Sequence, residues 1–307
     1  MTRAELAPTD PVLHSFAAEL GDRGLVSIAG RGTRWSAGGE IAPGVQILRA
    51  PTGIVEVSPA EMTVRVRAGT LVADLNDALA EVGQRSALPE RGGTVGGAIA
   101  VGEDHLDVLG RGRVRDSVLQ VRYVSAEGKI ISAGGAVVKN VSGFNLPKLI
   151  TGSLGTLGAI AEVVLRTNPK PSMSQWLVSC DADPQLSFNT LYRPSCVLWD
   201  GSRTWVHLEG HAVDVAAEFD GLRHVGKFEP ADSPPELPAH RWALTPRDAA
   251  SMTSVEGGDF VASIGVGTLW ADRPQAATPI DAALNVVHQR AKSLFDPTGR
   301  LNPGRAV

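Results

Sequence analysis

The sequence predicts a soluble globular protein with two domains that combine α-helices and β-strands. Its length of 307 residues suggests two domains at about 150 residues each. Hydrophobic residues make up 43% of the chain and charged residues 20%, which is typical of a globular protein. The texture of the sequence changes at 168–171, because glycine is frequent before this point and tryptophan after it. We therefore predict a domain boundary there.

Composition and charge exclude several classes of protein. The net charge of −4 gives no reason to expect nucleic acid as a partner. The two cysteines, Cys180 and Cys196, form no CxxC motif, so we expect neither an iron–sulfur cluster nor a structural zinc site in this chain. We favour two reduced thiols, with a bridge between them as the alternative. The chain has no apolar run of 18 residues and no signal-peptide core in "MTRAELAPTD", so we expect a cytoplasmic protein.

Periodicity predicts the elements of the N-terminal half. Apolar residues at helical spacing indicate a helix over 11–20, and a short strand follows at 25–29. The run "GIVEVSPAEMTVRVRAGT" predicts two strands around a Ser58-Pro59 turn. The next run, "TLVADLNDALAEVG", predicts a helix with Thr70 as its N-cap and Gly83 at its end.

Later elements follow the same rules. The run "DSVLQVRYVSAEGKIISAGG" predicts a β-hairpin around "AEGK", and a strand is expected at 160–166. In the second half, "SRTWVHLEG" predicts a strand and "HAVDVAAEFDGLRHVG" a helix. The run "PIDAALNVVHQRAKSLF" predicts a final helix before a turn-rich tail.

Three glycine-rich loops occur in the N-terminal half. Glycine lets backbone N–H groups approach a phosphate closely, and Arg31, Arg34 and Lys148 add positive charge. No loop matches the P-loop or a GxGxxG turn that opens a helix, and each taken singly is explained as a structural turn. Three of them in one half favour a dinucleotide site. They are "AGRGTRWSAGG" at 29–39, "ERGGTVGGAIAVG" at 90–102 and "SGFNLPKLITGSLGTLG" at 142–158.

Several segments together resemble a known family. They are "VKNVSGFNLPKLITGSLGTLGAIAEVVLR", "TVGGAIA" with "GRGRVRDSVLQVRYVSAEGKII", and "FDPTGRLNPGR". The chain resembles the FAD-linked oxidases of the vanillyl-alcohol-oxidase type, and among them the FAD-binding small subunits of bacterial glycolate oxidases. The resemblance implies an α+β fold, with a two-subdomain PCMH-type FAD-binding domain and a smaller α+β cap domain that has an antiparallel sheet. The implied domains are 1–168 for FAD, 169–289 for the cap, and 290–307 for the return to the FAD domain.

The resemblance also implies which residues contact FAD. The first loop matches the family's pyrophosphate loop, and the second matches a segment along the pyrophosphate and ribityl chain. In the third loop, glycines let the backbone approach the cofactor, while Ile160 offers backbone groups to the adenine end and Asn302 lies near the flavin. The expected FAD-binding residues are Gly30, Arg31, Gly32, Thr33, Arg34, Thr94, Gly96, Gly97, Gly152, Ser153, Gly155, Thr156, Gly158, Ile160 and Asn302.

Two departures from the family's motifs bear on how FAD is bound and on whether a metal is present. Relatives with covalent flavin carry a histidine in the first loop, and "AGRGTR" has none, so we expect non-covalent FAD. Larger 2-hydroxyacid dehydrogenases carry a metal motif of the type GxGDGNLH in the cap. The corresponding place here, "ASIGVGTLWA" at 262–271, has Trp270 where a histidine ligand would stand, so we expect no metal.

The catalytic base is not identified by any motif. His240 and Arg241 are weak candidates that face either the flavin pocket or solvent. The run "HLEGH" places His207, Glu209 and His211 on one face of a strand, where they could ligate zinc. We favour the alternative, a polar face of an edge strand.

Three alternating arginines precede the predicted hairpin. They offer either a basic rim for an anionic substrate or partner, or a solvated strand edge. They are Arg111, Arg113 and Arg115.

The leading hypothesis is a FAD-binding subunit of a multi-subunit 2-hydroxyacid (glycolate-like) oxidoreductase. The resemblance implies a larger FAD-containing hydroxyacid dehydrogenase subunit and an iron–sulfur subunit as partners, and a membrane association only through a partner. One alternative is a stand-alone FAD oxidase or dehydrogenase of a small alcohol or hydroxyacid. The other is a non-catalytic scaffold that keeps the flavin fold.

Overall fold

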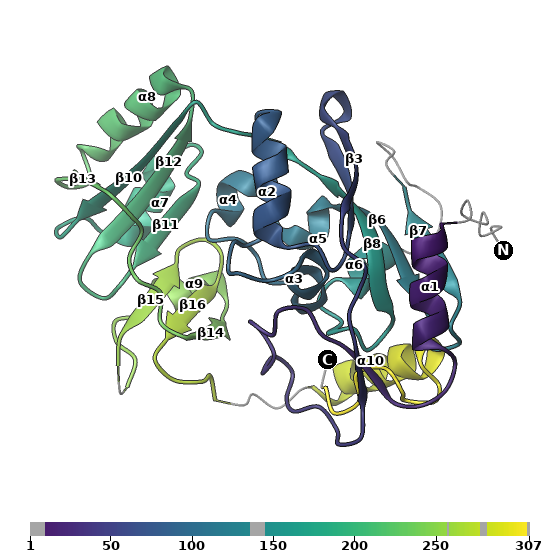
Figure 1. The fold of residues 1–307 in the computed structure, drawn as a ribbon. Helices are drawn as coiled ribbons and strands as arrows, with labels where there is room; N and C mark the ends of the chain where they lie inside the picture. Colours follow the sequence, from purple (N-terminus) through teal and green to yellow (C-terminus); the bar gives the residue numbers. More distant parts are fainter. Residues whose placement is uncertain (1–9, 136–144, 257, 277–280, 306–307) are drawn as a thin grey trace. The chain divides into compact units, whose positions relative to one another are not determined.

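The computed structural model describes residues 10–135, 145–256, 258–276 and 281–305, which group into two compact units (Figure 1). Unit 1 comprises Met1–His105, Arg113–Lys170 and Ile280–Val307, and unit 2 comprises Leu106–Gly112 and Pro171–Pro279. The short segment Leu106–Gly112 therefore leaves unit 1 and joins unit 2, although the sequence around it belongs to the first half of the chain.

Unit 1 is built on a five-stranded antiparallel sheet in the order β3-β4-β8-β6-β7. Three helices, α2 (Val72–Glu81), α3 (Val95–Val101) and α6 (Leu146–Ile150), share a core with it that includes Val66 and Leu75. The predicted hairpin and the strand at 160–166 are confirmed. The strands are β3 (Ile54–Ser58), β4 (Thr63–Arg67), β6 (Val118–Val124), β7 (Ile130–Gly134) and β8 (Ala159–Arg166), with a 3₁₀ turn at Pro59–Glu61.

A second core in unit 1 joins the N-terminal elements to the C-terminal tail. The helix α1 (Pro11–Leu20) packs Leu13 and Phe16 against the strands β1 (Val26–Ile28) and β2 (Gln46–Leu48), which pair in parallel. The tail residue Leu301 bridges to β1 and is 1% exposed. The N-terminal and C-terminal elements thus share one core. A further short pair in this unit is β5 (Gln84–Arg85) with β9 (Asn168–Pro169).

The predicted N-cap of α2 is wrong. Leu71 occupies the N-cap position and offers no capping side chain, whereas the Thr70 hydroxyl exchanges hydrogen bonds with the backbone N–H and carbonyl of Gly53. The loop before β3 competes for this hydroxyl, and a long-range partner cannot be read from local sequence. The predicted end is confirmed, because Gly83 has a φ of +69° directly after the C-cap Val82.

Alternation in the strands of unit 1 does not place every charge in solvent. Arg67 and Arg122 are each 7% exposed, and Glu162 is 1% exposed. Both arginines pair with Glu162, and Arg67 also binds Asp10, whose carboxylate caps α1. Buried ions of opposite sign on neighbouring strands neutralise one another, so these residues pack inside where a simple alternation rule puts them outside.

Unit 2 is built on a seven-stranded antiparallel sheet in the order β13-β10-β12-β11-β15-β16-β14. The helices α7 (Pro184–Thr190) and α8 (Ala212–Leu222) pack with Val197, Val206 and Leu208 of the sheet. A third helix, α9 (Pro246–Ala250), packs at β15 and β16. The strands are β10 (Met173–Ser179), β11 (Cys196–Trp199), β12 (Thr204–Gly210), β13 (Glu229–Ala231), β14 (His240–Ala243), β15 (Phe260–Ser263) and β16 (Thr268–Ala271).

The side chains that alternate with this core form a second cluster on unit 2. Cys196, Leu198, Trp205, Val261 and Trp270 make up its buried part, with Trp176 partly buried against it. These tryptophans are therefore core residues. Both cysteines are free, Cys180 exposed and Cys196 buried, which confirms two reduced thiols.

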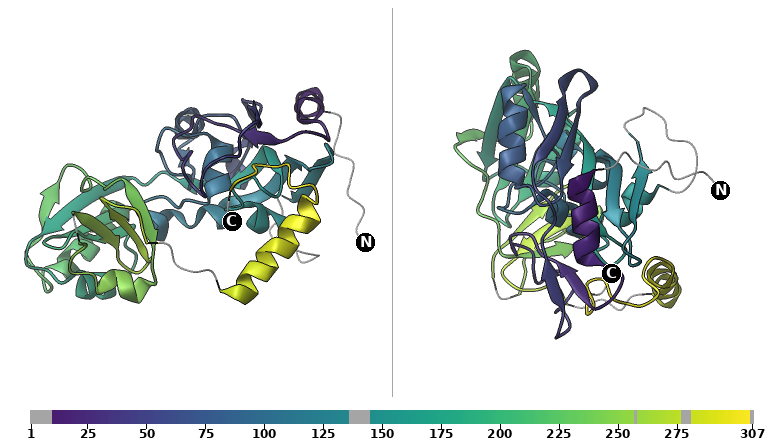
Figure 2. Two further views of the ribbon diagram at one scale, coloured as in Figure 1. Left: turned by 90° about the horizontal axis from the view of Figure 1, so that it is seen from below. Right: turned by 45° about the vertical axis from the view of Figure 1, so that its right-hand side comes forward.

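The predicted strand edge at Arg111–Arg115 is wrong, because this segment forms the short helices α4 (Val108–Arg111) and α5 (Val114–Ser117). The predicted final helix is confirmed as α10 (Ala282–Phe295). It lies at the periphery of unit 1, as both views of Figure 2 show, and none of its residues is buried. Among the described helices, none combines the length and the apolar character that a membrane span requires.

Candidate functional site

A cavity of about 90 Å³ lies in unit 1, where the first and second glycine-rich loops meet the C-terminal tail. This volume is below the roughly 300–1,000 Å³ of pockets that enclose a drug-sized ligand, so it fits one part of a dinucleotide. Eight of the expected FAD-binding residues line it, and they come from both of those loops and the tail. They are Gly30, Arg31, Gly32, Thr33, Arg34, Thr94, Gly97 and Asn302.

The electrostatics of the cavity favour an anion. Arg31, Arg34 and Arg305 line it, and none of its described lining residues is acidic. Arg34 is anchored behind the wall by an ion pair with Glu103, while one of its terminal nitrogens is buried without a hydrogen-bond partner in the described structure. A buried N–H without an acceptor costs free energy, which an anionic oxygen in the cavity would recover. The residues present therefore fit a pyrophosphate.

Glu103 holds two arginines in place beside the cavity. Its carboxylate binds Arg34 and lies 2.7 Å from a guanidinium nitrogen of Arg91. Burial by itself raises the pKa of Glu103, but the hydrogen bonds and charges of the two arginines outweigh it and hold the pKa below its ordinary value. The carboxylate thus stays ionised and fixes the rotamer of Arg34.

Glycine is required at Gly30 because of a close approach. A Cβ there would overlap the Thr94 hydroxyl oxygen, and that oxygen accepts a hydrogen bond from the N–H of Gly97 at the start of α3. The first two glycine loops therefore pack against each other directly. The sequence shows both loops as glycine-rich, but only the tertiary structure brings them into contact.

Hydrogen bonds join the C-terminal tail to the first and third glycine-rich segments. Asn302 accepts a hydrogen bond from the N–H of Ile28 at 3.1 Å and donates one to the carbonyl of Leu154 at 2.6 Å. Arg305 donates to the carbonyls of Ala37 and Gly39, and its guanidinium lies 5.2 Å from the ring centroid of Trp35. Arg305 and Trp35 are absent from the expected set, although "NPGR" lies within the segment that carried the resemblance.

The remaining expected residues do not line the cavity. Ser153 and Thr156 are 1% exposed, and their hydroxyls bond to backbone carbonyls three residues earlier. Gly155 approaches Asn302, and Gly158 approaches the ring of Tyr123. Only Leu154 of this segment lines the cavity, and Ser142–Phe144 of the predicted loop lie outside the described residues. The others are Gly96 against Ala68, Gly152 beside Gly102, and Ile160 in the core of unit 1.

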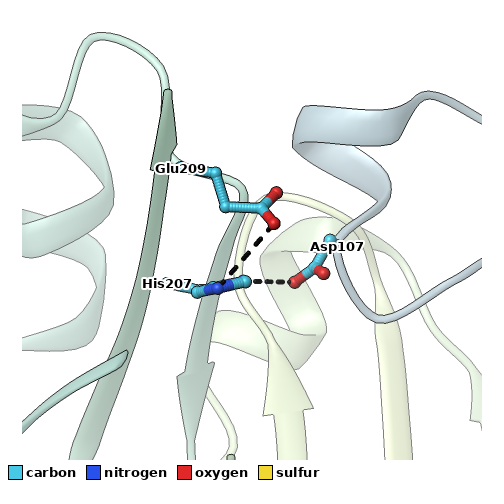
Figure 3. Close-up of side chains that lie close together, drawn as sticks. All are labelled: Asp107, His207 and Glu209. Atoms are coloured by element: carbon cyan, nitrogen blue, oxygen red, sulfur yellow. Dashed lines mark hydrogen bonds and ion pairs between the residues drawn. The ribbon is translucent and has the colours of Figure 1, made fainter. Parts of the chain in front are cut away.

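A second polar cluster lies in unit 2 (Figure 3). His207 and Glu209 point from β12 towards Asp107, which precedes α4. The Nδ1 atom of His207 lies 2.7 Å from a carboxylate oxygen of Asp107, and its Nε2 atom lies 2.8 Å from the hydroxyl of Ser174 and 4.0 Å from Glu209. The ring of Trp176 stacks on the imidazole at a centroid distance of 4.3 Å.

The predicted trio of His207, Glu209 and His211 does not assemble. His207 and Glu209 share a face of β12, but His211 lies beyond the strand at the exposed N-cap of α8. Asp107 takes the third place, and ligand atoms of the three residues lie within 4.8 Å of one another. No local sequence signal points to Asp107, because it comes from a segment 100 residues earlier in the chain.

The weak catalytic candidates lie on β14 of unit 2. His240 is half-buried and Arg241 is exposed, with a guanidinium nitrogen 3.5 Å from the Thr268 hydroxyl. Neither joins the cluster around His207 in Figure 3. Their role stays a prediction.

Comparisons with known proteins agree with this geometry. Residues 16–134 match the FAD binding domain family. The chain is 27% identical to the glycolate oxidase subunit GlcE of Escherichia coli. The alignment is 338 residues long and covers 96% of each chain. It is 32% identical to the glycolate oxidase subunit GlcD of Bacillus subtilis over 129 residues, or 41% of this chain and 27% of that protein.

Among solved structures, alkyldihydroxyacetonephosphate synthase has a similar fold. Its TM-score is 0.66 at 13% identity, and the match covers 98% of this chain and 75% of that one. At this identity the similarity concerns the fold alone. It agrees with the α+β fold of a PCMH-type FAD-binding domain with an antiparallel cap.

Proposed function

We propose that this chain is a FAD-dependent oxidoreductase of the FAD-linked oxidase family, and that it is the FAD-binding subunit of a multi-subunit 2-hydroxyacid oxidoreductase. The observation that carries the proposal is the similarity to a glycolate oxidase subunit over 96% of both chains. The larger FAD-containing hydroxyacid dehydrogenase subunit and the iron–sulfur subunit are proposed partners. The substrate class is a small 2-hydroxy acid.

The cavity in unit 1 is the proposed site of the FAD pyrophosphate. Arg31, Arg34 and Arg305 supply positive charge there, and the buried nitrogen of Arg34 supplies a free donor. The loop backbone around Gly30 and Gly32 supplies further N–H groups. The first loop "AGRGTRWSAGG" contains no histidine, which supports non-covalent binding. The other expected residues, from Gly152 to Ile160, are proposed to shape the wall.

Bound FAD supplies a two-electron acceptor for the carbon that carries the substrate hydroxyl. The protein holds the cofactor by charge in unit 1, and Glu103 keeps Arg34 oriented towards the phosphate position. Asn302 keeps the tail closed beside it. The proposed iron–sulfur partner would accept the electrons.

The first experiment is the visible spectrum of the purified chain, with the released flavin identified after denaturation. About one FAD per chain is expected. A chain that is colourless both alone and in its assembled complex would contradict FAD binding, and would favour the scaffold alternative. Co-expression with the neighbouring genes and affinity purification tests the partners. Steady turnover of a hydroxyacid with oxygen by the isolated chain would favour the stand-alone oxidase instead.

A further inference from the structure

The polar cluster of unit 2 places one histidine between two carboxylates (Figure 3). His207 and Glu209 lie on β12 and Asp107 precedes α4, so all three residues belong to unit 2. Their side chains are each 5% exposed. Ligand atoms of the three residues lie within 4.8 Å of one another. Imidazole nitrogen and carboxylate oxygen are common ligands of zinc in proteins, so this cluster has the chemistry of a metal site.

Asp107 fixes the tautomer of the imidazole. The Nδ1 atom of His207 lies 2.7 Å from a carboxylate oxygen of Asp107. Because an ionised carboxylate only accepts hydrogen bonds, the proton of the neutral ring lies on Nδ1 and the lone pair on Nε2. Histidines that bind metal ions almost always donate their other ring N–H to a carboxylate, a carbonyl or water. Asp107 therefore prepares His207 to bind a cation through Nε2.

Glu209 lies on the Nε2 side of the ring. One of its carboxylate oxygens is 4.0 Å from Nε2 of His207, and the other accepts a hydrogen bond of 2.9 Å from the Ser195 hydroxyl. Two ligand atoms on a tetrahedral zinc ion lie about 3.4 Å apart, so a side-chain shift of about half an ångström brings Glu209 into place. The Ser174 hydroxyl lies 2.8 Å from Nε2. Ser174 is exposed, so this hydroxyl and water have access to the remaining coordination positions.

The charges of the cluster favour a cation. Asp107 and Glu209 bring two carboxylates into a buried place, where negative charge without a counterion costs free energy. Arg111, with a guanidinium nitrogen 3.5 Å from Asp107, offsets part of that charge. Cys196 pairs with His207 across the sheet. Burial raises the pKa of the Cys196 thiol, and Asp107 and Glu209 add to this effect, so the thiol stays protonated beside the cluster.

The mixed set of ligands indicates which kind of ion fits. Mg²⁺ and Ca²⁺ prefer oxygen ligands, whereas an imidazole together with a carboxylate suits Zn²⁺ and related transition metals. The two carboxylates face opposite edges of the ring, so Glu209 reaches an ion on Nε2 while Asp107 keeps its place at Nδ1. These residues lie on β12 and before α4, whereas the metal motif of the larger relatives corresponds to 262–271.

We propose that His207 and Glu209 bind a divalent cation of the zinc class, and that Asp107 orients His207 for it. The Ser174 hydroxyl and water complete the coordination. Asp107 lies 100 residues before His207 in the chain, so the bound ion reinforces the contact that joins Leu106–Gly112 to the sheet of unit 2. The site lies within unit 2 and is independent of the proposed FAD site, so each proposal stands or falls alone.

The test is a titration of the full chain, freed of metal with a chelator, with Zn²⁺ by calorimetry and with Co²⁺ by visible difference spectra. All proteins carry Cys180→Ser, so that the exposed thiol does not bind the added metal. One Zn²⁺ per chain is expected. Mg²⁺ should not compete with it, because Mg²⁺ prefers oxygen ligands.

The variants distinguish the roles of the three residues. His207→Gln should abolish the binding of Zn²⁺. Asp107→Asn should weaken it about 10–100-fold, as is typical when a carboxylate that orients a ligand histidine is removed. Glu209→Gln should weaken it at least as strongly as Asp107→Asn. His211→Gln, which changes an exposed histidine of the same unit, is the matched control and should keep the affinity of the unsubstituted site.

Thermal unfolding separates a metal site from a cluster that only stabilises the fold. Zn²⁺ at about 100-fold above its Kd should raise the unfolding midpoint, because an ion that binds only the folded state stabilises it. This rise should vanish in His207→Gln and Glu209→Gln, whatever their midpoints without metal. Absence of stoichiometric Zn²⁺ binding, or equal affinity with and without His207→Gln, overturns the proposal. If His207→Gln does not fold, the isosteric Glu209→Gln decides, and equal affinity in that variant overturns the proposal.

Discussion

Asn302 is expected to couple the stability of unit 1 to its cofactor cavity. It is 7% exposed and has a φ of +44°. Asn302→Ala removes the hydrogen bonds to Ile28 and Leu154, each worth about 1–2 kcal/mol because the partners are left half-buried and unpaired. Alanine also tolerates the left-handed conformation less well than asparagine, which adds about 1 kcal/mol. The expected loss is roughly 3–5 kcal/mol.

The assay is thermal unfolding of the FAD-free and FAD-loaded chain by circular dichroism, together with the FAD content. At about 2–4 °C per kcal/mol for a domain of this size class, the midpoint should fall by roughly 6–20 °C. Asn302→Gly is the matched control, because it loses the same hydrogen bonds and relieves the backbone strain, so it should recover about 1 kcal/mol. An Asn302→Ala chain that melts within about 2 °C of wild type and keeps its FAD would refute this reasoning.

Three further substitutions probe other contacts of unit 1. Gly30→Ala should weaken FAD binding at least about tenfold, because the new Cβ displaces the Thr94 side chain. Unchanged affinity by fluorescence titration would contradict this. Arg300 donates hydrogen bonds to five backbone carbonyls, most of them around the end of α1. Arg300→Met should therefore lower the free energy of unfolding, measured in urea, by about 3–5 kcal/mol. A loss below about 1 kcal/mol would argue against this role of Arg300. Burial raises the pKa of Asp296, but Lys292 and two backbone N–H groups outweigh burial and lower it below 3.8. The stability that this ionised carboxylate contributes is thus complete above about pH 4 and is lost as pH falls through the lowered pKa. Asp296→Asn should therefore make the free energy of unfolding depend less on pH below about pH 4. The same pH dependence in this variant as in the wild type would contradict the assignment.

Local periodicity was enough to predict most of the elements. The helix at 11–20, the hairpin around 125–129 and the strand at 160–166 follow from patterns that burial enforces within a few residues. The error at Thr70 has a different origin, because its hydroxyl binds Gly53 of the preceding loop. The burial of the arginines in the sheet could not be predicted for the same reason, since a strand pattern does not reveal that Glu162 lies on the next strand.

The glycine-rich loops indicated a cofactor site through residue type alone. A backbone that approaches a phosphate closely needs glycine, and glycine is visible in the local sequence. The resemblance added the tail around Asn302. It did not supply Arg305 over Trp35, or the role of Glu103 behind Arg34. These contacts join residues that are far apart in the chain. In its local sequence, each of these side chains looks like an ordinary surface residue.

The sequence by itself determined the class of elements, the change of texture at 168–171 and the glycine-rich character of a dinucleotide site, because these depend on residue type and short-range spacing. Only the tertiary structure decided which charges meet. It brought Asp107 to His207 across 100 residues and carried His211 away from it at the start of a helix. Hydrogen bonds between distant segments depend on how strands and loops pack, and packing is a property of the whole fold.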